Sequence, residues 1–213
     1  TPLSGNIGGR IPGVRYRNKT LSLDGELLVN VFDGQVRINR LSSSGLWSDF
    51  PRVKTDIAID NIDLDQLTRK FSFGNITGKL SGFVTNLMLE SRRPVSFIAW
   101  FGTPEGDDSS HSISQKAVNN IASIGGGGAT DLISRSFLGF FETFRYSKIG
   151  VGCYLHNGVC QMSGVEAAEQ GYYLVKGGCL PRIDVLGYNT QVNWDVLVER
   201  LARVASPNQA IIQ

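Results

Sequence analysis

The residues of this sequence that could do chemistry are three cysteines and two histidines. The cysteines are Cys153, Cys160 and Cys179, and the histidines are His111 and His156. A catalytic triad or a Cys–His pair needs a histidine that the fold can place beside a nucleophile. His156 lies in an expected turn and His111 in a polar stretch, and the cysteine spacing does not match a zinc site. We therefore expect no catalytic residues, no metal and no cofactor.

Aspartates are frequent in the first third of the chain, but they do not suggest an acid–base pair. They lie at expected turns, helix caps or outward-facing strand positions, and they are Asp24, Asp33, Asp56, Asp60 and Asp63. Carboxylates at such positions are usually solvated groups. The sequence therefore predicts that the protein is not an enzyme.

Two of the cysteines flank an expected hairpin turn and could form a disulfide. If the turn is Asn157-Gly158, Cys153 and Cys160 are diagonal neighbours about 7–8 Å apart, which is mostly too long for a disulfide. If the turn starts one residue earlier, they lie directly opposite each other and within reach. We favour a Cys153–Cys160 disulfide, with Cys160–Cys179 or three free thiols as the alternatives.

Composition indicates a folded chain dominated by sheet. Of the residues, 41% are apolar and 19% charged, and the 21 basic and 19 acidic side chains leave a formal charge of +2. This balance gives no basic surface for nucleic acid. The longest apolar runs are far shorter than the roughly 20 residues of a membrane-spanning helix. Glycine is enriched, with 25 of 213 residues against about 7% on average, and it recurs within alternating segments, where it marks turns and bulges.

The clearest element is a hairpin over residues 26–42. Asp33-Gly34 is a favoured two-residue turn, which predicts that Val31 faces Val36 and that Val29 faces Ile38. These residues would form one apolar face, and the other face would be mostly polar.

Two further segments could be ordinary core or could line a groove. The run 95–101 (VSFIAWF) is apolar on both faces, with Phe97 and Phe101 on one side and Ile98 and Trp100 on the other. It could be a strand buried by helices, or one face could line an apolar groove. In 74–90, glycines 78 and 82 share a face with apolar residues. Either a short helix packs across these glycines or they leave a hollow for a ligand.

Helical periodicity predicts four short helices, near residues 63–71, 112–124, 130–144 and 193–204. Asp63 and Asn193 would cap the first and the last. The third would carry an apolar stripe that includes Phe137, Phe140 and Phe141. Such a stripe is usually core, but it could also be a lid over acyl chains.

The order of four segments along the chain resembles the C-terminal region of YdbH-like proteins, within the AsmA-like superfamily. They are GELLVNVFDGQVRINRL, DIAIDNIDLDQLTRKFSFGNITGKLSGFV, FRYSKIGVGCYLHNGVCQMSGV and YYLVKGGCLPRIDVLGYNTQVNWDVLVERL. The resemblance implies a mainly β fold with α elements: a curved, groove-like, mostly antiparallel sheet, a β-taco, with several short covering helices. The groove domain would span residues 21–205, after an N-terminal segment 1–20 and before a flexible tail 206–213.

The resemblance also implies a function without catalysis. The chain would be a module of a phospholipid transport bridge in the periplasm of a Gram-negative envelope, and its apolar groove would conduct acyl chains toward the outer membrane. The full-length protein would be anchored in the inner membrane upstream of Thr1, with a small outer-membrane lipoprotein as partner. Candidate groove residues are Phe97, Ile98, Trp100, Phe101, Phe137, Phe140 and Phe141. The alternative is a scaffolding module that docks a partner by β-strand addition at an open sheet edge.

Overall fold

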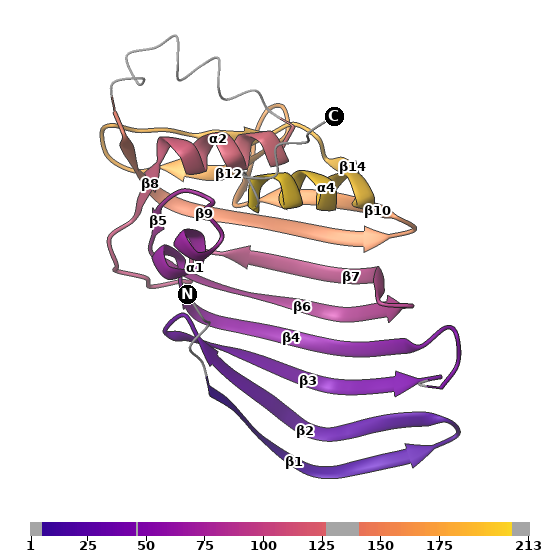
Figure 1. The fold of residues 1–213 in the computed structure, drawn as a ribbon. Coiled ribbons are helices and arrows are strands. Elements are labelled where there is room, and N and C mark those ends of the chain that lie inside the picture. Colours follow the sequence, from indigo (N-terminus) through magenta and orange to yellow (C-terminus); the bar gives the residue numbers. More distant parts are fainter. Residues whose placement is uncertain (1–5, 46, 127–140, 206–213) are drawn as a thin grey trace, which may run out of the picture.

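One open, curved, mainly antiparallel sheet forms the body of the protein in the computed structural model, which describes residues 6–45, 47–126 and 141–205 (Figure 1). Strand order along the sheet is β1-β2-β3-β4-β6-β7-β9-β10-β14, and the sheet does not close into a barrel. The predicted fold class is therefore confirmed. Its strands are β1 (Asn6–Arg17), β2 (Thr20–Val31), β3 (Gly34–Ser44), β4 (Arg52–Asp63), β5 (Ile76–Thr77), β6 (Lys79–Glu90), β7 (Arg93–Gly102), β8 (Ser112–Ser114), β9 (Thr143–His156), β10 (Val159–Gly164), β11 (Glu166–Ala167), β12 (Tyr172–Gly177), β13 (Val185–Gly187) and β14 (Gln191–Asn193).

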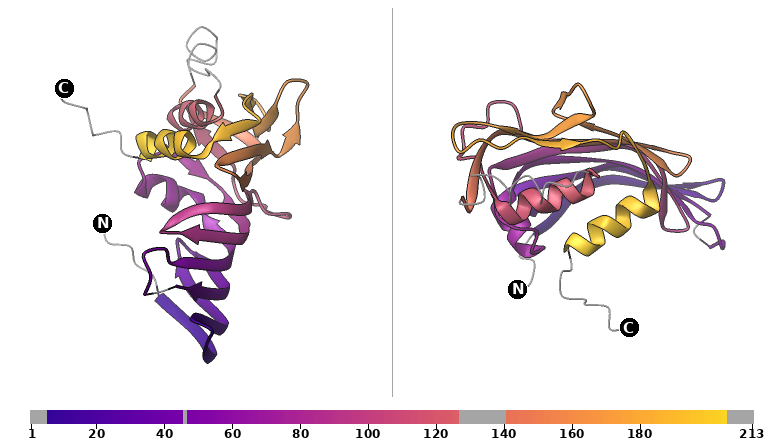
Figure 2. Two further views of the ribbon diagram at one scale, coloured as in Figure 1. Left: turned by 90° about the vertical axis from the view of Figure 1, so that its right-hand side faces the viewer. Right: turned by 90° about the horizontal axis from the view of Figure 1, so that it is seen from above.

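The helices that the structure describes all lie on one face of the sheet. They are α1 (Leu64–Lys70), α2 (Gln115–Ile124) and α4 (Trp194–Ala205), and Figure 2 shows α2 and α4 inside the concave side of the sheet. The main hydrophobic core lies between these two helices and the strands from β8 to β14, and it includes Ile113, Val118, Phe144 and Val175. None of the helices that the structure describes is long and apolar enough to cross a membrane.

The N-terminal hairpin is confirmed, but its predicted register is wrong by two residues. Val29 pairs with Val36, and the turn is Phe32-Asp33, with φ of 50° and 54°. Gly34 instead belongs to β3, where an added Cβ would lie 2.6 Å from the Asp60 carbonyl oxygen of β4. That glycine therefore permits close strand contact rather than the turn. A shift of two residues keeps every side chain on its expected face.

The sequence predicts an N-terminal segment over residues 1–20, before the groove domain. Within them, Asn6–Arg17 forms β1, which pairs with β2 as the first strand of the same sheet. The predicted tail 206–213 lies outside the described residues.

The residues predicted to cap the first and last helices do so in the structure, whereas the predicted start of the second helix is wrong. The Asp63 carboxylate accepts the Gln66 N–H at 3.0 Å at the start of α1, and the Asn193 side chain accepts two N–H groups at the start of α4. Residues 112–114, which were expected to be helical, form β8 instead, and the Ser114 hydroxyl caps α2.

The predicted helix 130–144 lies mostly outside the described residues, and its expected end is wrong. Thr143 and Phe144 begin β9. Phe144 and Tyr146 are buried while Arg145 between them is exposed, which is the period-two pattern of a strand. Phe144 matched the helical spacing of the upstream phenylalanines by coincidence.

A column of β-bulges crosses the sheet and accounts for its curvature. The pairing register shifts at Gly25 in β2, at Arg40 in β3 and at Asn86 in β6, and all three residues have positive φ. Bulges bend a strand and increase its local twist. Because they fall at the same level in neighbouring strands, their effects add, and the sheet curves around the face that carries the helices.

Asp56 on β4 connects two of these bulges. Its carboxylate forms an ion pair with Arg40 and accepts the backbone N–H of Asn86 at 2.7 Å. In the same place the Thr55 hydroxyl donates to the Asn39 carbonyl at 2.9 Å. These polar contacts pair groups that the bulges remove from the regular ladder.

We predict that Asp56→Ala lowers the free energy of unfolding by about 1.5–3 kcal/mol, because it removes a charged acceptor from a backbone donor. The Asp56 side chain is only 13% exposed. Asp60→Ala is the matched control, since Asp60 is 42% exposed and its ion pair with Arg37 lies at the surface; it should cost less than about 1 kcal/mol. Urea unfolding measures both, and equal losses would contradict the bracing role of Asp56.

Candidate apolar groove

The concave face of the sheet is apolar across most of its strands. Cross-strand pairing aligns one row of side chains from β2 to β10: Leu27, Ile38, Ile57, Val84, Ala99, Cys153 and Met162. A second row runs beside it and contains Val29, Val36, Ile59, Gly82, Phe101 and Val151. We refer to these two rows together as the apolar floor.

Burial of the floor changes along the sheet. Residues contributed by β2, β3, β4 and β6 are only half-buried, and none of the described helices lies over the floor at β2 and β3 (Figures 1 and 2). Beside the floor at β7 and β9, Phe97 is 7% exposed and Leu155 is fully buried. There Trp194 of α4 packs edge-on against Phe97, with ring centroids 5.3 Å apart. The floor is thus open over the N-terminal strands and covered at the C-terminal end.

The opposite, convex face mixes polar and apolar side chains over the same N-terminal strands, since Leu28, Ala58 and Phe83 share a row with Arg37. Arg37 and Asp60 form an ion pair of 2.8 Å there, and the Gln35 amide donates to Asn30 at 3.1 Å. The two faces therefore differ in that the floor rows contain no polar side chain, whereas polar and charged side chains interrupt the convex rows.

The four candidate groove residues of β7 divide between the two faces. Phe97 and Phe101 lie on the concave face, whereas Ile98, which is 43% exposed, and Trp100 lie on the convex face. The Trp100 ring covers glycines of β9: an added Cβ on residue 150 or 152 would lie 3.0–3.1 Å from it. Ile98 and Trp100 therefore do not line the groove.

Of the candidates in the predicted third helix, Phe141 alone belongs to the described residues. Phe137 and Phe140 lie outside the described residues. Phe141 is half-buried outside any helix or strand and packs against the main core.

The glycine face of β6 is neither crossed by a helix nor hollow. A Cβ on Gly78 would lie 2.5 Å from the Tyr146 hydroxyl and 2.9 Å from the His111 ring, and one on Gly82 would lie 2.8 Å from the Phe101 ring. Aromatic side chains from other strands and loops thus occupy the space that these glycines leave. Sequence reasoning could not find this, because the partners are distant in the chain.

The floor residues from β2 to β6 were not among the sequence candidates. Their signal was present, since Val29, Val36 and Ile57 each lie in alternating segments. The alternation within each segment does not give the order and register of the strands. These decide whether the apolar faces of separate strands form one surface.

A buried polar cluster lies at the end of the sheet near β8. The His111 ring stacks on Tyr146, with centroids 4.9 Å apart, and its Nε2 lies 2.9 Å from Asp107. The Tyr146 hydroxyl donates to the Thr77 carbonyl. Burial and the Asp107 charge raise the pKa of Tyr146 well above its usual range. With its hydroxyl bonded to backbone and no nucleophile beside His111 among these partners, the cluster joins β5, β8 and β9 structurally.

The predicted Cys153–Cys160 disulfide is confirmed, and of the two hairpin registers left open the structure has the one that makes the cysteines diagonal neighbours. Cys153 and Cys160 are bonded, Cys179 is free and exposed, and the turn is Asn157-Gly158. The cysteines are therefore diagonal neighbours, yet their Cα atoms lie only 5.5 Å apart. The twist of the strand pair brings one of the two diagonals closer than the flat-sheet value.

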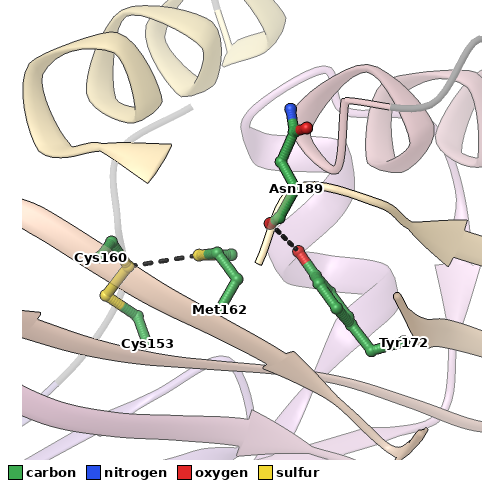
Figure 3. The surroundings of a disulfide bond; sticks show 5 residues. All are labelled: Cys153, Cys160, Met162, Tyr172 and Asn189. Carbon is green, nitrogen blue, oxygen red and sulfur yellow. Dashed lines mark hydrogen bonds between the residues drawn. A yellow bond between two sulfur atoms is a disulfide. The ribbon is translucent and has the colours of Figure 1, made fainter. Parts of the chain in front are cut away.

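The surroundings of the disulfide belong to the covered end of the groove (Figure 3). Cys160 is fully buried, and its Sγ lies 3.2 Å from Met162 Sδ. Nearby, the Tyr172 hydroxyl donates to the Asn189 carbonyl at 3.2 Å. In the described part of the chain, no group of three or more His, Cys, Asp or Glu side chains could hold a metal ion.

Comparisons of the chain with protein-family models, with curated proteins and with solved structures returned no match. The geometry described above, together with the resemblance stated from the sequence, is therefore the basis for the function proposed below.

We predict that Asp107 makes stability depend on pH in the acid range. Burial alone would raise the pKa of Asp107, but hydrogen bonds from Ser109, His111 and the Lys79 backbone outweigh it and hold the pKa well below its ordinary value. A carboxyl group with a lowered folded-state pKa stabilises the fold above its unfolded pKa of about 4, and this contribution is lost as pH falls below that value.

Urea unfolding of the wild type and of Asp107→Asn, followed from about pH 7 to about pH 2, checks this prediction. The wild type should be more stable near neutral pH, and the difference should shrink as the solution is acidified. A difference that does not change with pH would rule out ionisation of Asp107 as its origin.

For the cysteines, we expect peptide mapping without reductant to recover Cys153 joined to Cys160 and Cys179 open to alkylation. Cys153→Ser together with Cys160→Ser should lower the free energy of unfolding by about 2 kcal/mol, near the lower end of the usual range because the closed loop is short. Cys179→Ser is the matched control and should leave stability unchanged. Recovery of Cys179 in a disulfide would overturn the assignment.

Proposed function

We propose that this chain is a non-catalytic module that holds phospholipid acyl chains along its apolar floor, as part of a transport bridge across the Gram-negative periplasm. The observation that carries the proposal is the continuity of the floor from β2 to β10, combined with the fact that no described helix covers it over the N-terminal strands. A soluble fold rarely leaves a contiguous apolar surface exposed unless something binds it.

The chemistry of the floor suits an acyl chain. Burial of apolar surface contributes about 25 cal/mol per Å² and about 0.8 kcal/mol per methylene group, and it has no directional requirement. A chain on such a surface can slide without breaking specific bonds. The sheet is open, so a charged head group can remain in water while the acyl chains lie on the floor. No polar side chain interrupts the two rows between β2 and β10.

The resemblance to the C-terminal region of YdbH-like proteins supports the same proposal and adds its setting. In that setting the full-length protein is anchored in the inner membrane, the groove extends through the periplasm, and a small outer-membrane lipoprotein is the partner. The Cys153–Cys160 disulfide is consistent with an oxidising compartment. The covered end of the floor, where Trp194 packs on Phe97, would then be the end of the open groove in this chain.

Site-specific photo-crosslinking in bacterial cells tests the proposal. A photo-crosslinking amino acid at Val36 should capture phospholipid, because this floor residue is half-buried and belongs to the open part of the groove. Gln35 is the matched control: it is the adjacent residue of β3, and it lies on the convex face beside Asn30. Mass spectrometry of the crosslinked adducts identifies the captured molecule. Lipid adducts of equal yield at both positions, or at neither, would contradict a lipid-holding groove.

A second candidate function, a scaffold that docks a partner by strand addition, is favoured by one specific observation. Of the described strands along the sheet path, β1 pairs with β2 alone and leaves a long edge open, whereas at the other end β14 has only three residues and leads directly into α4. Open edges are the usual sites of strand addition. Protein adducts without lipid adducts in the same crosslinking experiment would favour this function.

A further inference from the structure

Three turns at one side of the sheet form a continuous edge. The turn at Lys19 is joined to the turn after β3 by a hydrogen bond from the Gly45 N–H to the Lys19 carbonyl, at 3.4 Å. A second hydrogen bond joins the segment after β3 to the β6–β7 turn: the Ser91 N–H donates to the Pro51 carbonyl at 3.0 Å. Figure 1 shows these turns at the same ends of β1, β2, β3, β4, β6 and β7. We refer to this edge as the basic lip, and the residues that define it are Arg17, Lys19, Trp47, Phe50, Arg92 and Arg93.

Two large apolar side chains are held in solvent at the centre of the basic lip. Trp47 is 90% exposed and Phe50 is 75% exposed. The turn that carries them is internally bonded: the Ser48 N–H donates to the Gly45 carbonyl at 2.9 Å, and the Ser48 hydroxyl accepts the Phe50 N–H at 3.3 Å. The turn is therefore a defined structure that presents both rings outward instead of tucking them onto the sheet.

Most of the charged side chains around these two rings are basic, and one acidic residue, Asp49, lies between the rings in the same turn. Arg17, Lys19, Arg92 and Arg93 are exposed, and within the described ranges none of them forms an ion pair. The nearby Arg52 and Glu90 neutralise each other at 2.8 Å. Four cations against the single carboxylate of Asp49 leave a local surplus of three positive charges, in a chain whose net charge is only +2.

We propose that the basic lip docks on the surface of an anionic phospholipid bilayer. Tryptophan and phenylalanine favour the boundary between head groups and acyl chains, and lysine and arginine beside them attract anionic lipid. The lip combines both features. Its residues come from three consecutive turns along one edge, which suits an extended surface better than the cleft of a protein partner.

This proposal does not depend on the groove function, because it uses none of the floor residues. A protein that holds no lipid in its groove could still bind vesicles through the lip, and a lipid-holding groove could exist without lip binding. The result of the vesicle experiment therefore does not depend on the result of the crosslinking experiment that tests the groove.

Vesicle flotation of the chain tests the proposal. The probes are vesicles of phosphatidylcholine alone and vesicles of phosphatidylcholine mixed with phosphatidylglycerol. We expect binding to the anionic vesicles, weakened by salt, and little binding to the neutral ones. Arg92→Gln combined with Arg93→Gln should reduce the partition coefficient roughly twenty-five-fold, since each cation near an anionic surface contributes about a factor of five.

The matched control removes the same charge elsewhere. Lys116→Gln combined with Lys148→Gln neutralises two exposed lysines on α2 and β9 that likewise form no ion pair in the described structure, and vesicle binding should remain near the wild-type level. Equal losses in the two double variants, equal binding to neutral and anionic vesicles, or no binding at all would overturn the proposal.

Depth-dependent fluorescence quenching locates the contact. Vesicles that contain brominated lipid should quench part of the tryptophan emission of the wild type, because Trp47 enters the interface. The quenched part should disappear in Trp47→Phe, while vesicle binding is largely retained. Quenching that persists in Trp47→Phe would place the contact elsewhere and exclude the lip as the docking surface.

Discussion

An open sheet with one apolar face must shelter that face from water by curving around it, by covering it or by binding something on it. This constraint organises the whole molecule. Where β7, β9 and β10 provide the floor, α2 and α4 supply the cover and a dense core results. Where β2 to β6 provide it, curvature gives partial shelter, and the side chains stay half-buried. The third means, a bound apolar ligand, is the one that the proposed function invokes.

Curvature of this kind requires local exceptions to strand regularity, and each exception creates an unpaired polar group. The bulges at Gly25, Arg40 and Asn86 are tolerable because polar side chains compensate for them, most directly at Asp56. Asp56 lies on the convex face and Arg40 in a bulge, whereas Thr55, which donates to the Asn39 carbonyl, lies on the floor face beside the two rows. The apolar rows stay uninterrupted on the other side of the same strands.

The sequence predicted local structure well and relations between distant segments poorly. Alternation and turn residues indicated the N-terminal hairpin, the Asp63 and Asn193 caps and the disulfide, because each depends on residues close in the chain. The register of the hairpin was missed because Gly34 meets β4, which a two-strand argument does not include. For the same reason, neither the filling of the glycine face by Tyr146 and His111 nor the alignment of the floor across strands could be foreseen. Residues such as Trp100 were assigned correctly to a face, but which face becomes concave is decided only by the complete sheet.

The floor and the basic lip are parts of one surface, and this bears on how the two proposals relate. Directly beside the Arg52–Glu90 ion pair of the lip, Val53 pairs with Leu89 in the next position of the ladder. Between this pair and the floor, the same face carries Leu87 together with two buried hydroxyl side chains, Thr55 and Ser43, so the surface that leads to the turns with Trp47 and the unpaired cations is partly apolar. Such a sequence of environments, from a charged edge through aromatic rings to an apolar surface, follows the order that a phospholipid itself has from head group to acyl chain. If both proposals hold, a lipid that leaves a bilayer docked at the lip would enter the groove by passing from a charged edge to an apolar surface.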